Sequence, residues 1–178
     1  KVEDVSNTTV KKNDFRGPLF ALDGSKNKNW TLLRFNNKEN PLQLYNKRYP
    51  HAAVKVSVLD LDEWPDAKDT SNTVLLEKFK QLHKTAHKAL TVAGLTSDII
   101  SSATNYQIAG QSFINIQTKD KKNKEVKQYE SMYIIRKGNS LLMFSLMTYS
   151  KDKKVFDISN RDFSEMLQKS LTLTPAVK

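Results

Sequence analysis

Cysteine is absent from this chain of 178 residues, which excludes disulfide bonds, thiolate metal sites and cysteine nucleophiles. Glycine is scarce, at only 5 residues, and Gly24 and Gly138 stand alone, so no glycine-rich loop is available to bind a phosphate. No serine lies in a Gly-x-Ser-x-Gly motif. We therefore expect a protein that is not an enzyme and holds no cofactor. A secreted effector with an unrecognised active site remains an alternative.

Long apolar runs are also missing, because no stretch approaches the roughly 18 residues that span a bilayer. What the chain has in excess is positive charge, with 29 Lys and Arg against 19 Asp and Glu and a net charge of +10. Such a surplus favours polyanions, namely nucleic acid, anionic lipid head groups or an acidic protein. A solvated lysine-rich surface is the alternative reading.

The chain begins at Lys1 without an initiator Met. Removal of a signal peptide would explain this, and so would a trimmed boundary. The absence of cysteine is compatible with an oxidising space, where a stray thiol is a hazard. We therefore expect an extracytoplasmic location, periplasmic or secreted.

The apolar pattern predicts one domain. Residues 1–14 are polar and predict a flexible tail, residues 15–174 a single α+β domain, and residues 175–178 a disordered end. Short strands are expected at Trp30–Phe35 and Leu42–Tyr45. The segment Ala52–Leu61 alternates apolar and polar residues, which predicts a stronger strand.

Two helices are predicted by apolar residues at steps of 3 and 4. The long helix, Thr70–Ala93, has a stripe that includes Leu75 and Phe79 and ends before Gly94. The short C-terminal helix, Asn160–Ser170, follows a loop at residues 151–154. Residues 96–110 are ambiguous, and residues 98–103 are compatible with a helical turn.

Three further strands are predicted at Gln111–Thr118, Val126–Arg136 and Leu141–Tyr149. The pair Gly138 and Asn139 suits a tight turn between the last two. Because Leu141–Met147 is apolar on both faces, we expect it to be a central strand that is covered on both sides.

A family resemblance rests on three segments, Tyr133–Arg136, Leu141–Thr148 and Phe163–Leu171. With a helix after early strands, long antiparallel strands and a short C-terminal helix, the layout of residues 42–173 resembles the PsbP-like superfamily of PsbP, Mog1 and DcrB-like proteins. The resemblance implies an α/β/α sandwich with a central antiparallel sheet. It also implies an extracytoplasmic protein, in the bacterial branch a lipoprotein, that binds rather than catalyses. The lipid-modified cysteine of that branch does not occur in this chain.

No metal site is predicted. His83 and His87 lie four residues apart on the long helix, but the glutamate of a zinc-protease helix is missing between them. An acidic run lacks the spacing and the glycine of a calcium loop, so we interpret it as a solvated loop before the helix. Its members are Asp60, Asp62, Glu63, Asp66 and Asp69.

The candidate site is a basic hairpin loop, expected over residues 119–127. Its lysines are Lys119, Lys121, Lys122, Lys124 and Lys127. Beside it, Tyr129 and Tyr133 could stack on bases of a single strand. We expect a non-enzymatic binding or accessory domain whose partner is a protein or an anionic surface rather than a small molecule. The alternative is a nucleic-acid or acidic-protein binding module that uses this basic surface.

Overall fold

The computed structural model describes residues 2–3, 14–65, 68, 71, 73–75, 77–79, 81 and 95–174, with residues 2–3 and 95–105 described by their backbone. Eight strands form one antiparallel sheet in the order β1-β4-β5-β6-β10-β9-β8-β7. In chain order they are β1 (Val2–Glu3), β4 (Trp30–Phe35), β5 (Leu42–Asn46), β6 (Ala52–Asp60), β7 (Leu95–Ile108), β8 (Gln111–Lys122), β9 (Glu125–Lys137) and β10 (Ser140–Thr148).

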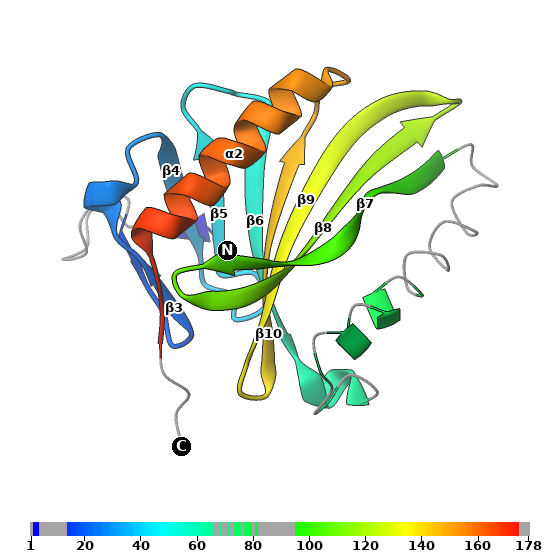
Figure 1. The fold of residues 1–178 in the computed structure, drawn as a ribbon. Coiled ribbons are helices and arrows are strands. Elements are labelled where there is room, and N and C mark those ends of the chain that lie inside the picture. The colour runs from blue at the N-terminus through cyan, green and yellow to red at the C-terminus, as the bar shows by residue number, and fades with distance from the viewer. Residues whose placement is uncertain are drawn as a thin grey trace.

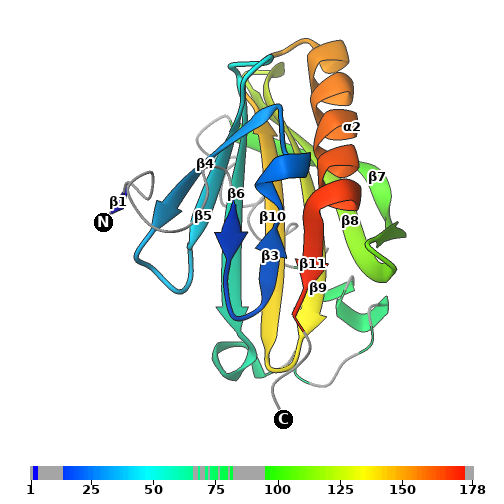
Figure 2. The same ribbon diagram turned by 90° about the vertical axis from the view of Figure 1, so that its left-hand side faces the viewer.

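A second layer covers one face of this sheet. It consists of the helix α2 (Lys153–Ser170) and a small sheet of β2 (Phe15–Arg16), β3 (Phe20–Leu22) and β11 (Leu171–Leu173). Figure 1 shows α2 crossing the face of the large sheet, and Figure 2 shows β3 and β11 in the same layer. Short 3-10 helices occur at η1 (Gly24–Lys26) and η2 (Leu61–Glu63). The predicted α+β class, with a central antiparallel sheet and a C-terminal helix, is confirmed.

The main core lies between the large sheet and this second layer. Alternating residues of the central strands point into it, as the period-2 pattern predicted. Phe144 of β10 contacts Phe20 and Phe163 edge-on or tilted, with ring centroids 5.3 and 6.3 Å apart. Trp30 of β4 packs on Phe163 at 5.4 Å. One ring of α2 therefore joins an early strand to the central strand.

A smaller apolar cluster lies on the opposite face of the large sheet. Leu61 and Leu75 cover Leu141 and Ile134 there, and Phe79 packs against the same cluster. Helical backbone occurs at residues 73–75, 77–79 and 81, within the predicted helix Thr70–Ala93. The remainder of that helix, with His83 and His87, lies outside the described residues, as do residues 175–178.

The central position of β10 is confirmed, because it pairs with β6 on one side and β9 on the other. Its coverage differs from the prediction. Phe144 and Leu146 are fully buried, whereas Met143 and Met147, on the opposite face, are half-buried. Among the described residues the second face is thus closed near Leu141 and more open toward Met147.

Several predicted boundaries were wrong. Residues 98–103 are strand rather than a helical turn, because pairing with β8 extends β7 over fourteen residues. The C-terminal helix starts at Lys153, not Asn160, because the Asp152 carboxylate accepts a hydrogen bond from the Lys154 amide and caps the first turn. In the predicted tail, Val2 and Glu3 pair with β4 and Asp14 is buried, so these positions are tied to the domain.

Candidate functional site

The predicted basic loop is a continuous β-hairpin. β8 runs to Lys122 and β9 starts at Glu125, so only Asn123 and Lys124 form the turn. Both have positive φ, at 53° and 69°, which is typical of the two-residue turns that match the twist of paired strands. A register shift after Asp120 inserts an extra residue into β9, which is a bulge. We name the surface of Lys119, Lys121, Lys122, Lys124 and Lys127 the basic hairpin.

The basic hairpin contains few acidic residues. Glu125 accepts a hydrogen bond from Lys127 at 3.0 Å, and Asp120 accepts one from Gln128 at 3.2 Å. The bond from Lys127, then its charge and that of Lys151, hold the pKa of Glu125 below its ordinary value. Lys151 precedes α2, so the start of this helix adds positive charge to the same surface. The basic hairpin and Lys151 together therefore carry six positive charges against the two carboxylates of Asp120 and Glu125.

Tyr129 and Tyr133 do not present ring faces to solvent, and the prediction that they form a surface for base stacking was wrong. Tyr129 is 7% exposed and stacks on Phe156 of α2, with ring centroids 5.2 Å apart. Tyr133 is 1% exposed and donates a hydrogen bond to Asn160 at 2.7 Å. Burial raises the pKa of Tyr133 to about 12. The side chains of both tyrosines point toward α2 and pack this helix onto the sheet.

Two members of the acidic run, Asp60 and Asp62, have structural roles. Asp60 caps η2 by accepting from the Asp62 amide at 2.9 Å, and it also accepts from the side chain of Asn139. Asp62 pairs with Lys68 at 2.6 Å, and this bond is the main cause of its lowered pKa. Asp66 and Asp69 lie outside the described residues. His51 is exposed in the turn before β6.

A half-buried carboxyl group, that of Glu130 on the second face of the sheet, was not found from the sequence. Glu130 lies opposite Met147 and Thr118 in the register of β9. Burial, followed by the negative charge of Asp120, raises its pKa from 4.5 to about 7. The alternation of β9 could have revealed that this glutamate faces away from α2. The neighbours of Glu130 depend on how β9 pairs with β8 and β10, which cannot be read from the sequence.

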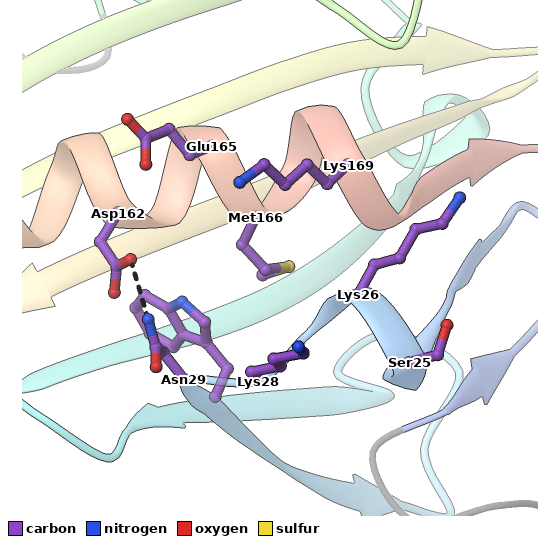
Figure 3. A pocket seen from close by; sticks show the side chains of 9 residues that line it. Ser25, Lys26, Lys28, Asn29, Asp162, Glu165, Met166 and Lys169 are labelled. Carbon is purple, nitrogen blue, oxygen red and sulfur yellow. Dashed lines mark hydrogen bonds between the residues drawn. The ribbon is translucent and has the colours of Figure 1, made fainter.

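The structure also forms a cleft that sequence reasoning missed, between α2 and the segment before β4. Its volume is about 660 Å³. We name it the α2 cleft, and Figure 3 shows its side chains. They belong to Ser25, Lys26, Lys28, Asn29, Trp30, Asp162, Glu165, Met166 and Lys169.

The polar groups of the α2 cleft are unevenly arranged. In Figure 3, Asp162 and Glu165 lie toward one end, while Lys26 and Ser25 lie toward the other. The two oxygens of Asp162 accept hydrogen bonds from the Asn29 amide at 3.4 Å and the Asn46 amide at 2.7 Å. Asp162 therefore already ties α2 to the ends of β4 and β5.

The segment that forms one wall of the α2 cleft carries buried polar atoms without hydrogen-bond partners among the described residues. They are the indole nitrogen of Trp30 and both side-chain amide atoms of Asn27. Trp30 is 1% exposed and Asn27 is 0% exposed. A buried donor without a partner costs about 1–3 kcal/mol, and most buried polar groups avoid this cost. These groups therefore call for a physical explanation.

Among the described helices, none combines the length and apolar character that crossing a membrane requires. No protein-family model matches the chain, and no curated protein matches its sequence. The fold does match solved structures, and it places the chain among α+β domains with the PsbP-like and Mog1-like fold. The predicted resemblance to PsbP-like proteins is confirmed for the fold.

Three similar structures illustrate the match. Cyanobacterial PsbP from Synechocystis sp. PCC 6803 is 11% identical over 94% of this chain and 96% of its own, with a TM-score of 0.63. The Ran-binding protein Mog1p of Saccharomyces cerevisiae is 13% identical over 93% and 97%, at 0.51. LpqN of Mycobacterium tuberculosis, involved in cell envelope biogenesis, is 12% identical over 96% and 95%, at 0.52. At these identities the likeness concerns the fold.

Proposed function

We propose that this chain is a non-enzymatic binding or accessory domain that recognises an acidic partner protein through its basic hairpin. The observation that carries the proposal is the two-residue turn, which leaves only Lys124 in the turn and places the other four lysines on the strands β8 and β9. The backbones of Lys119, Lys121 and Lys122 are paired in the β8–β9 ladder, so less conformational entropy is lost when a partner binds. Charge complementarity would then steer the partner toward this surface.

An acidic protein is favoured over a nucleic acid because of the two tyrosines. Binding of a single strand combines phosphate contacts with bases stacked on aromatic rings. Tyr129 and Tyr133 are packed beneath α2, so they leave the basic hairpin without those rings. Lysine-rich strands without stacking rings suit carboxylates on a folded partner. The Ran-binding protein Mog1p is one protein of this fold that acts on another protein.

An acidic peptide, a single-stranded oligonucleotide and vesicles containing phosphatidylserine are the probes that test this proposal. Each is titrated at about 0.15 M salt, where distant exposed charges are largely screened. The test variant changes Lys119, Lys122, Lys124 and Lys127 to Ser. The control changes four other lysines to Ser, so both variants have the same net charge. These are Lys38, Lys47, Lys55 and Lys137.

We expect the peptide to bind more tightly than the other two probes, and its affinity to fall about tenfold or more in the test variant alone. Equal losses in the test and control variants would mean that only net charge matters and would refute the site. Preferential binding of the oligonucleotide would refute the choice of a protein partner. Preferential binding of the vesicles would also refute the choice of a protein partner, because it would show that the basic hairpin binds anionic membrane surfaces.

We further propose that the domain works outside the cytoplasm. The absence of cysteine supports this location, because an oxidising compartment penalises stray thiols. The involvement of the similarly folded LpqN in cell envelope biogenesis is in agreement. Fractionation of source cells, with an antibody against this domain, should recover it outside the cytoplasm. Recovery with cytoplasmic marker proteins would refute the location but not the basic hairpin.

A further inference from the structure

We propose that the α2 cleft binds a small organic anion, a phosphate or carboxylate group joined to a flat apolar group. The cleft belongs to a different part of the surface from the basic hairpin, and no hairpin lysine lines it. Its volume of about 660 Å³ falls within the range of roughly 300–1,000 Å³ that is usual for small-molecule sites.

The anionic part of the ligand is indicated by charge. Lys26, Lys28 and Lys169 come from two segments, η1 with its following residues and the last turn of α2. All three side chains are exposed, so an anion can reach them without rearrangement of the core. They give the cleft three positive charges against the two carboxylates.

The carboxylates do not cancel this preference, because they lie toward the end away from Lys26 (Figure 3). Asp162 is also engaged there by the amides of Asn29 and Asn46. An anion beside Lys26 therefore has no fixed carboxylate directly next to it, whereas the Lys169 side chain runs back toward Glu165 (Figure 3).

The apolar part of the ligand is indicated by Trp30 and Met166. Both line the cleft although their side chains are almost wholly buried, at 1% and 5% exposure. A tryptophan ring and a thioether offer a polarisable contact for an aromatic or other flat group.

The second, independent observation is the unsatisfied indole N–H of Trp30. Buried indoles normally donate a hydrogen bond, and this one has no partner among the described residues. An acceptor oxygen of a ligand that settles onto Trp30 would supply one after a small side-chain adjustment. The side-chain amide of Asn27, which also has no partner among the described residues, belongs to the same chain segment, between the lining residues Lys26 and Lys28.

The test follows the two indole N–H resonances of the intact protein by NMR while phenyl phosphate is added. Inorganic phosphate, benzoate and benzyl alcohol are titrated in parallel, which separates the anion from the ring and phosphate from carboxylate. Trp64 is an internal reference, because it packs in the cluster on the opposite face of the sheet. The spectrum of Trp64→Phe assigns the two signals.

We expect a saturable shift of the Trp30 resonance with phenyl phosphate or benzoate, and none of Trp64. Inorganic phosphate and benzyl alcohol should each bind about tenfold more weakly or worse. Changing Lys26, Lys28 and Lys169 to Ser should reduce the affinity about tenfold or more, whereas the matched change of Lys38, Lys55 and Lys137 should leave it unaltered. Preserved dispersion of the spectrum shows that each variant is folded.

Three results would overturn the proposal: no saturable shift of Trp30 below about 10 mM of either aromatic anion, binding of benzyl alcohol as tight as that of phenyl phosphate, or full affinity in the cleft variant. The variant of the basic hairpin should bind phenyl phosphate like the unaltered protein. Failure of the cleft and failure of the hairpin proposal are therefore separate outcomes.

Discussion

Phe144 is the residue whose truncation should most directly test the packing of the central strand. Its side chain is 0% exposed, and its ring lies 5.3 Å from Phe20, 6.3 Å from Phe163 and 6.4 Å from Phe113. These neighbours belong to the small sheet, the helix and another central strand, so no single element can move to fill the space. Phe144→Ala should therefore reduce the free energy of unfolding by about 3–5 kcal/mol.

Urea denaturation followed by circular dichroism measures this change. With a slope of about 2 kcal/mol per molar urea, a loss of about 4 kcal/mol lowers the midpoint by about 2 M. Tyr149→Ala is the control, because Tyr149 follows the same strand but is 58% exposed, and it should change stability by about 0.5 kcal/mol or less. An unchanged midpoint for Phe144→Ala would refute the central assignment of β10.

Three further changes test local features. Lys124→Gly should increase the free energy of unfolding by about 0.5–1 kcal/mol and so raise the urea midpoint, because the φ of 69° at this position suits glycine. Asn160→Ala should lower the free energy of unfolding by about 1–3 kcal/mol, because the Tyr133 hydroxyl then loses its acceptor. Adding Tyr133→Phe to this variant should restore much of the lost stability. Between pH 4.5 and about 7, folded Glu130 keeps a proton that the unfolded chain releases. As the pH rises through this range, the unaltered protein should therefore lose up to about 3 kcal/mol of unfolding free energy relative to Glu130→Gln. Parallel urea denaturation curves of the two proteins at several pH values measure this difference.

Alternation and helical spacing were sufficient to predict much of the core. Ala52, Val54 and Val56 point to the main core, and Phe163 and Leu167 bury the face of α2, as their spacing indicated. These signals are local, because each needs only a few neighbouring residues. The same signals predicted that the strands on either side of Gly138 are antiparallel, and the positive φ of 58° at Gly138 fits the predicted turn.

The errors arose where pairing between distant residues overrides local character. Residues 98–103 have no strong apolar alternation, but pairing with β8 holds them extended, with Asp98, Ile99 and Ser101 in register and two register shifts between Ile99 and Thr104. The lysine-rich segment was interpreted as a loop because of its charge. A ladder of backbone hydrogen bonds does not require apolar side chains, and the turn at Asn123 and Lys124 closes it.

The α2 cleft could not be predicted for a related reason. Asn29 and Asp162, which join its two walls, are 133 positions apart in the sequence. Neither the early lysines nor those of α2 form a motif, and Trp30 has the pattern of an ordinary core residue. Only the docking of α2 beside the segment before β4 brings the three ammonium groups together.

One helix supports both proposed surfaces. At its first half, Phe156 stacks on Tyr129 of β9, and the Lys151 charge that precedes the helix reaches Glu125 of the basic hairpin. At its second half, Phe163 packs on Trp30 while Asp162, Met166 and Lys169 line the α2 cleft. Tyr133 and Asn160 lie between these contacts and are joined by a partly buried hydrogen bond. Because the apolar face of α2 is fixed along its length, its polar face can carry charges for two ligands without loss of the core.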